Sequence, residues 1–186
     1  MPAQAAQPAP TQTETIPEEP RTMFRIAINH GQQGLAYSML DEGYNLMHAM
    51  QDAMDEKKFQ LCLTLLSKYT DDKIVQQKNN KGQNLFHVLC ENSMGCRLEH
   101  LKRIYETLKK RGVDCLEVDG LGRSALHYAV GGGQKELVEM LLDQGADPRT
   151  IDMHGDTPLT LYLKGPTACK SVRLYNTVLG TYDPIF

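Results

Sequence analysis

Apolar side chains recur at helical spacing along much of this chain. Two stretches show the pattern most clearly, one near residue 140 and one over residues 97–112. Apolar residues three and four positions apart share one face of a helix, so each stretch is predicted to bury a stripe. The stripes are formed by Leu137, Val138, Leu141 and Leu142, and by Leu98, Leu101, Ile104, Tyr105 and Leu108. The predicted fold class is therefore all-α.

Two further helical segments flank the middle of the chain. Residues 22–40 are predicted to form two short helices broken near Gly31, as a cap on the N-terminal end of the fold. Residues 165–186 begin with Gly165 and Pro166, which stop a helix, and then turn helical again as a C-terminal cap. The apolar residues expected to pack from the first cap are Phe24, Ile26, Ile28 and Leu35.

A glycine followed two residues later by a helix N-cap residue recurs at long intervals. Gly122 and Gly155 are 33 residues apart, whereas Gly82 precedes Gly122 by 40 residues and Gly43 precedes Gly82 by 39. A period in this range is typical of stacked structural repeats. The additional residues of the two longer intervals are expected in or after the second helix of each repeat, around 67–77 and 91–100.

The repeated segments resemble the ankyrin repeat. DGLGRSALH, from Asp119, and DMHGDTPLT, from Asp152, follow the family pattern of Asp, two variable residues, Gly, one variable residue and TPLH. Residues 138–146 match the family's VxxLLxxGA segment, and two earlier copies share the variant GxNLxH. The resemblance covers roughly residues 40–165. It implies a solenoid of paired antiparallel helices with β-turn fingers over residues 41–164, in about four units of which the first two diverge.

The resemblance also implies a structural role for the positions that match the repeat motif. The residues in place of the family's Thr are expected to cap the first helix of each unit, and the histidines to bond between adjacent turns. Gly122 and Gly145 are expected in left-handed conformations, at a turn and at a helix end. The expected caps are Asn45, Asn84, Ser124 and Thr157, and the expected bridging histidines are His48, His87 and His127.

Composition points to an intracellular protein, cytoplasmic or nuclear. Residues 1–21 are rich in Pro, Gln and Thr and are predicted to be a disordered tail. The net charge of -3 gives no general attraction to nucleic acid or membranes, and neither is expected as a partner. Five cysteines at irregular spacing argue against a disulfide framework, so reduced thiols are expected.

No catalytic motif, cofactor or metal site is expected. His87, Cys90, Cys96 and His100 have the residue types of a zinc site, but His87 fits the turn role and Cys90 the buried face of a helix. Gly131–Gly133 lack the Gly-Lys-Ser/Thr of a phosphate loop and fit a turn between paired helices. Residues 97–111 carry a local charge of +4, which fits a solvated outer helix face better than a site for an acidic partner.

The predicted function is protein–protein interaction, as an adaptor or assembly subunit that is monomeric when isolated and binds an unidentified protein. Ankyrin proteins bind through finger tips and the concave face, which the repeat register maps onto this sequence. Two alternatives stay open: a structural subunit of a large complex, and a regulatory segment of a larger enzyme, since the units are similar to ankyrin segments of poly(ADP-ribose) polymerase-like proteins. The partner-binding residues predicted are Tyr44, Lys81, Gln83, Leu121, Arg123, Tyr128, Met153, His154 and Asp156.

Overall fold

The computed structural model describes residues 18–164. This part of the chain contains helices and no strand, with one isolated antiparallel bridge between Val118 and Ser124. The helices are α1 (Glu18–Asn29), α2 (Gln33–Asp41), α3 (Leu46–Asp55), α4 (Phe59–Lys68), α5 (Asp72–Val75), α6 (Leu85–Asn92), α7 (Leu98–Lys110), α8 (Ala125–Gly131), α9 (Lys135–Asp143) and α10 (Pro158–Lys164).

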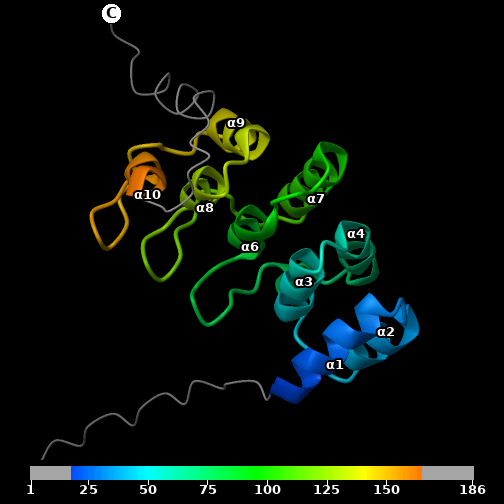
Figure 1. Ribbon diagram of the computed structural model, residues 1–186. Helices are drawn as coiled ribbons and strands as arrows, with labels where there is room; N and C mark the ends of the chain where they lie inside the picture. Colours follow the sequence, from blue (N-terminus) through cyan, green and yellow to red (C-terminus); the bar gives the residue numbers. More distant parts are fainter. Residues whose placement is uncertain (1–17, 165–186) are drawn as a thin grey trace, which may run out of the picture.

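The helices form two rows of a solenoid, as the repeat pattern predicts. Helices α1, α3, α6, α8 and α10 make the inner row, and each packs against the next. Helices α2, α4, α7 and α9 each pair with the inner helix before them. Loops project to one side before α6, α8 and α10 (Figure 1). The all-α fold of paired helices is thus confirmed. We number the units 1 (α3 and α4), 2 (α6 and α7), 3 (α8 and α9) and 4 (α10).

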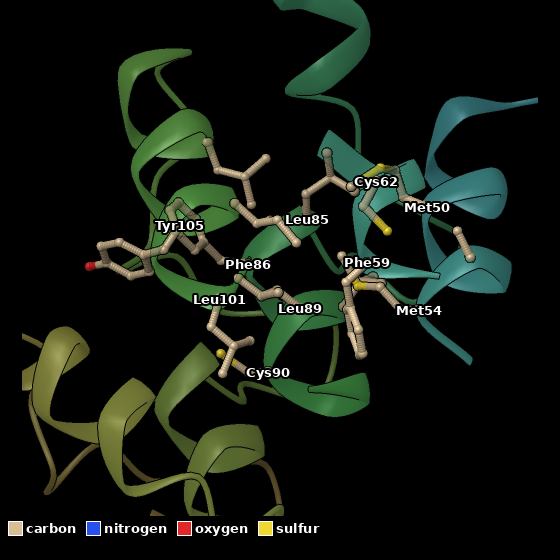
Figure 2. Packing of buried hydrophobic residues seen from close by; sticks show 14 of the residues in the cluster. Met50, Met54, Phe59, Cys62, Leu85, Phe86, Leu89, Cys90, Leu101 and Tyr105 are labelled. Carbon is tan, nitrogen blue, oxygen red and sulfur yellow. The ribbon is translucent and has the colours of Figure 1, made fainter. Parts of the chain in front are cut away.

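The core runs through the stack because neighbouring units share it. Met50 and Met54 of α3 face Leu85 and Leu89 of α6 across the interface of units 1 and 2 (Figure 2). All four side chains are buried almost completely, and so are the stripe residues predicted on α7 and α9, apart from Leu98 and Leu142. One unit alone would leave its inner face in water, so each unit depends on its neighbours for stability.

The helix ends confirm most of the expected capping. Asn45 accepts a hydrogen bond from Met47 N at 2.7 Å, and Asn84 accepts from Phe86 N at 3.0 Å. The glycines after α8 form the turn between paired helices, with Gly133 at a φ of +72°. Gly145 ends α9 at a φ of +90°, the left-handed conformation expected there.

The N-terminal cap differs from its prediction in two respects. Helix α1 begins at Glu18, within the stretch 1–21 that was predicted to be disordered, because its first turn tolerates Pro20. Phe24 and Ile28 pack into the core, but Ile26 and Leu35 are 46% and 42% exposed. The α1–α2 pair is short, and each helix buries only one side. The predicted C-terminal cap, 165–186, lies outside the described residues.

The additional residues of the long repeats lie in two different places. Between Lys68 and Asn79 they form the short helix α5 after the second helix of unit 1, as expected. Residues 93–97 instead join the first and second helices of unit 2. The expectation that these residues lie in or after the second helix was therefore wrong. Buried Ser93 fixes the start of this loop by donating to Cys90 O at 3.1 Å. No helix within residues 18–164 is long and apolar enough to cross a bilayer.

Candidate protein-binding surface

Three finger turns project before α6, α8 and α10, and one side-chain geometry builds all of them. We name them finger 2 (79–83), finger 3 (119–123) and finger 4 (152–156). In each, the Oδ1 atom of the first residue accepts from the N–H groups two and four residues later, at 2.8–3.0 Å. The first residues are Asn79, Asp119 and Asp152. The Asp of the family pattern is therefore the group that closes the turn.

Neighbouring fingers are joined by backbone hydrogen bonds at their tips. Gly120 N donates to Lys81 O at 2.8 Å, and Met153 N donates to Leu121 O at 2.9 Å. A Cβ on Gly82 would lie 2.8 Å from Gly120 N, so this close approach requires glycine. The tips of fingers 2 to 4 consequently form one continuous edge.

Two histidines connect the first helices to the fingers, as the resemblance implies. His87 Nδ1 accepts from Asn84 N at 3.2 Å, and its Nε2 donates to Arg123 O at 3.1 Å. His127 repeats the arrangement with Ser124 N and Asp156 O, both at 3.1 Å. Burial lowers the pKa of both histidines, although the carbonyl acceptors favour the charged form. Both rings are structural groups whose two nitrogens are occupied.

Unit 1 departs from this plan. Leu40 stands where the other units have Asn or Asp, so no side chain is present to close a finger, and α2 runs almost directly into α3. The Nδ1 atom of His48 is buried and accepts no hydrogen bond. The expectation that His48 bridges adjacent turns was wrong: His87 and His127 each accept from the N–H of their own N-cap residue, whereas the Nδ1 of His48 has no partner.

Several residues predicted to contact a partner are instead held within the chain. The side chain after each turn glycine reaches the residue eight positions later in three units. Tyr44 donates to buried Asp52 at 2.7 Å, Gln83 to Glu91 at 3.3 Å, and Lys164 to Asp156 at 2.5 Å. Gln83 is 1% exposed and Asp156 is 8% exposed. The prediction that both are accessible to a partner was therefore wrong.

Arg123, the residue after the turn glycine of unit 3, is also held within the chain, but by a partner on the next finger. The residue eight positions later is Gly131, which has no side chain, and Arg123 Nε instead lies 3.0 Å from Asp152 Oδ2 of the next finger. Burial alone would raise the pKa of Asp152, but the N–H groups of Asp156 and His154 and the Arg123 guanidinium lower it to about 2. Arg123 therefore holds fingers 3 and 4 together.

Tyr128 is also committed to the scaffold. Its hydroxyl donates to Asp119 Oδ2 at 2.5 Å, and its half-buried ring lies edge-on to His87. Burial and this bond raise the pKa of Tyr128 to about 12. Lys81 and His154, by contrast, are exposed at the tips of fingers 2 and 4.

Fingers 3 and 4 carry exposed apolar side chains. Leu121 is 40% exposed and Met153 is 71% exposed, and the backbone bond between them places them side by side. Val118 and Ile151, each just before the Asp that closes its finger, are 45% and 63% exposed. The sequence analysis missed these two, although an apolar residue before the turn Asp in both copies was visible. We call Val118, Leu121, Ile151 and Met153 the apolar finger row.

The described residues contain no group of three or more His, Cys, Asp or Glu side chains placed to hold a metal ion. Cys62, Cys90, Cys96 and Cys115 are all free thiols. Burial raises the pKa of the Cys62 thiol to about 12, and that of Cys90 further still. Thiols with such raised pKa values are held in the neutral, unreactive form.

Comparison with known proteins agrees with this geometry. A family model for ankyrin repeats (3 copies) matches residues 11–152, and again residues 94–169. This chain belongs to the ankyrin-repeat family. A protein of Acanthamoeba polyphaga mimivirus described as an ankyrin repeat protein is 52% identical over 46 residues, 25% of this chain and 6% of that protein. A tyrosine-protein kinase of Hydra vulgaris is 33% identical over 73 residues, 39% of this chain and 9% of the kinase. The chain thus matches under a tenth of the length of either relative.

Proposed function

We propose that this ankyrin-repeat chain acts as an adaptor or assembly subunit that binds a protein partner through fingers 3 and 4. Ankyrin repeats are in general protein–protein interaction modules, and the apolar finger row supports this role here. Four apolar side chains, 40–71% exposed, lie on fingers 3 and 4 or directly before them, outside the core. Adjacent exposed apolar side chains on rigid turns are typical of interaction sites.

The proposed site excludes part of the surface predicted from sequence. Gln83, Arg123 and Asp156 serve the scaffold, so the proposal rests on Leu121, Met153 and their neighbours, with Lys81 and His154 as polar rim. We propose further that the chain has no active site of its own and acts inside the cell, in the cytoplasm or nucleus, as a monomer when isolated.

The test is affinity capture with tagged full-length chain from native extract, followed by identification of the captured protein. Replacing Leu121 and Met153 together by serine should release the partner, because both side chains are exposed and outside the core. Met94→Ser is the matched control, since Met94 is 60% exposed but lies in the loop between α6 and α7. Equal capture by the double variant and the control would contradict the proposal.

A second candidate is a regulatory segment within a larger enzyme. The match to the Hydra tyrosine-protein kinase supports it, because that enzyme contains a segment related to this chain. Immunoblotting of native extract with an antibody against residues 41–164 tests the idea. A band far above the 20.9 kDa of this chain would support it, and a band at that mass would oppose it.

A further inference from the structure

The exposed side chains along the finger edge change in character from finger 2 to finger 4. The loops that carry the three fingers project to the same side of the solenoid (Figure 1). Lys81 O accepts from finger 3, and Leu121 O accepts from Met153 N of finger 4, so these three residues follow one another along the edge. The exposed side chains of finger 2 are Asn80 and Lys81, whereas those of fingers 3 and 4 include Leu121 and Met153. One end of the edge is therefore polar and basic, and the other is mainly apolar.

The carboxylates of the fingers are all engaged within the chain. Asp119, Asp152 and Asp156 are 7%, 4% and 8% exposed. Asp152 pairs with Arg123 at 3.0 Å, and Asp156 pairs with Lys164 at 2.5 Å. Asp119 accepts from two backbone N–H groups of its own finger and from a tyrosine hydroxyl of α8. A partner that contacts the fingers therefore finds no open carboxylate there.

Lys81 offers a cation at the basic end of the edge. Its N–H donates to Asn79 Oδ1 at 3.0 Å, and its carbonyl accepts from Gly120 N at 2.8 Å, so its backbone is fixed. Its side chain is exposed and forms no ion pair within residues 18–164. Lys78, directly before the same finger, pairs instead with Glu117 at 3.1 Å. A carboxylate from another protein can thus reach the Lys81 ammonium without breaking an ion pair of the fold.

We propose that the partner segment bound by the fingers carries an acidic side chain beside its apolar ones. Its apolar side chains cover Leu121 and Met153, and its carboxylate binds the Lys81 ammonium. This inference rests on the proposed function, because it uses the same apolar finger row. Opposite charges at the rim of an interface steer the encounter and fix the orientation of the partner. A basic segment would instead meet Lys81 with no open carboxylate on the fingers to bind, so the surface selects against it.

The probe is a phage-displayed library of random peptides, selected on the immobilised full-length chain. We expect the selected peptides to combine apolar residues with Asp or Glu on one side of them. Selection on the Lys81→Glu variant should replace Asp and Glu by Lys or Arg. Lys102→Glu is the matched control, since it makes the same charge change at an exposed position of α7, and its peptides should resemble those of the wild type. No enriched peptide, peptides without Asp or Glu, or the same peptides on Lys81→Glu would overturn the inference.

Calorimetric titration of a selected peptide separates this inference from the proposed function. Lys81→Glu should weaken binding about fivefold at low salt, and the difference should shrink as salt is added. The double variant with Leu121 and Met153 replaced by serine should lose binding in either case. Peptides that bind Lys81→Glu as well as the wild type, but not the double variant, would refute the acidic partner and leave the finger row as the site. Peptides that bind the double variant equally well would refute both.

Discussion

Buried polar residues carry much of the specificity of this fold. Asp52, His87 and His127 are fully buried, and Asp152 is 4% exposed. Each binds a group on a different element: Asp52 binds Arg21 of α1 at 2.7 Å, and the histidines bind the next finger. A buried polar group without its partner is costly, so these residues fix which elements can pack together.

Asp52→Ala should lower the free energy of unfolding by about 2–4 kcal/mol, because it leaves Tyr44 and Arg21 without their acceptor. Urea denaturation of the full chain measures the change. Asp55→Ala is the control: Asp55 is partly exposed, its nearest cation atom is 3.8 Å away, and the loss should stay below about 1 kcal/mol. Equal losses in the two variants would contradict the role given to Asp52.

The two bridging histidines should make stability depend on pH. Burial lowers their folded pKa below 6.5, so as pH falls the unfolded chain takes up protons that the folded chain does not. The free energy of unfolding should therefore fall as pH drops below about 6.5. Asp152 should add a second loss as pH drops from about 4 toward its folded pKa of about 2.

Urea midpoints measured from pH 8 down to pH 5 test the histidine contribution. The double variant His87→Gln and His127→Gln should be less stable at pH 8 but should show a flatter pH profile. A wild-type profile without slope below pH 6.5 would contradict this account of the histidines.

At the scale of the element, the fingers are held by side-chain and backbone hydrogen bonds. Each turn is closed by one Asn or Asp and bonded to its neighbour through a backbone N–H. Fingers 3 and 4 are also bonded to His87 and His127 of the preceding units. Rigid turns hold the apolar finger row in place without help from a partner. Binding by such a surface loses little conformational entropy.

Gly82→Ala should destabilise the fold more than Gly31→Ala. Both glycines have φ near +70°, so both substitutions carry the left-handed strain of about 1–2 kcal/mol. A Cβ at Gly82 also meets Gly120 N at 2.8 Å, whereas one at Gly31 meets nothing within 4 Å. The difference, about 1–3 kcal/mol, is measurable by urea denaturation, and equal effects would argue against close packing of the finger tips.

The whole molecule is an array whose couplings are uneven. Units 2, 3 and 4 are joined by core packing, finger bonds and histidine bonds, while unit 1 joins unit 2 without a finger bond or a bridging histidine. In a repeat array, stability depends on the interfaces between nearest neighbours. The N-terminal half should therefore open more readily.

Native-state hydrogen exchange followed by NMR tests this expectation. Amides of α3 and α4 should exchange faster than those of α6 and α8, because local opening removes fewer inter-unit bonds. Replacing His87 by Gln should speed exchange in α8, so that the exchange rates of the N-terminal and C-terminal halves become more similar. Uniform protection across α3 to α8 in the wild-type chain would contradict the uneven coupling.

The sequence by itself determined the repeat, the helix pairs of units 2 and 3 and the caps at Asn45 and Asn84. These features depend on local chemistry: a glycine that needs positive φ, a side chain that caps a helix and apolar residues at helical spacing. Sequence also identified the fingers, since the Asp of DxxG both marks and closes fingers 3 and 4. Leu40 indicates that unit 1 has no side chain to close a finger. This becomes clear only when Leu40 is aligned with Asn79 and Asp119, which close the fingers of units 2 and 3.

Only the tertiary structure decided which variable positions are free to bind. Gln83, Arg123 and Asp156 lie at finger positions that vary in type, yet each is engaged by a group eight residues later or on the next finger. Exposure depends on what neighbouring units place around a side chain, and no single repeat contains that information. The apolar finger row arises in the same way, from the register between units.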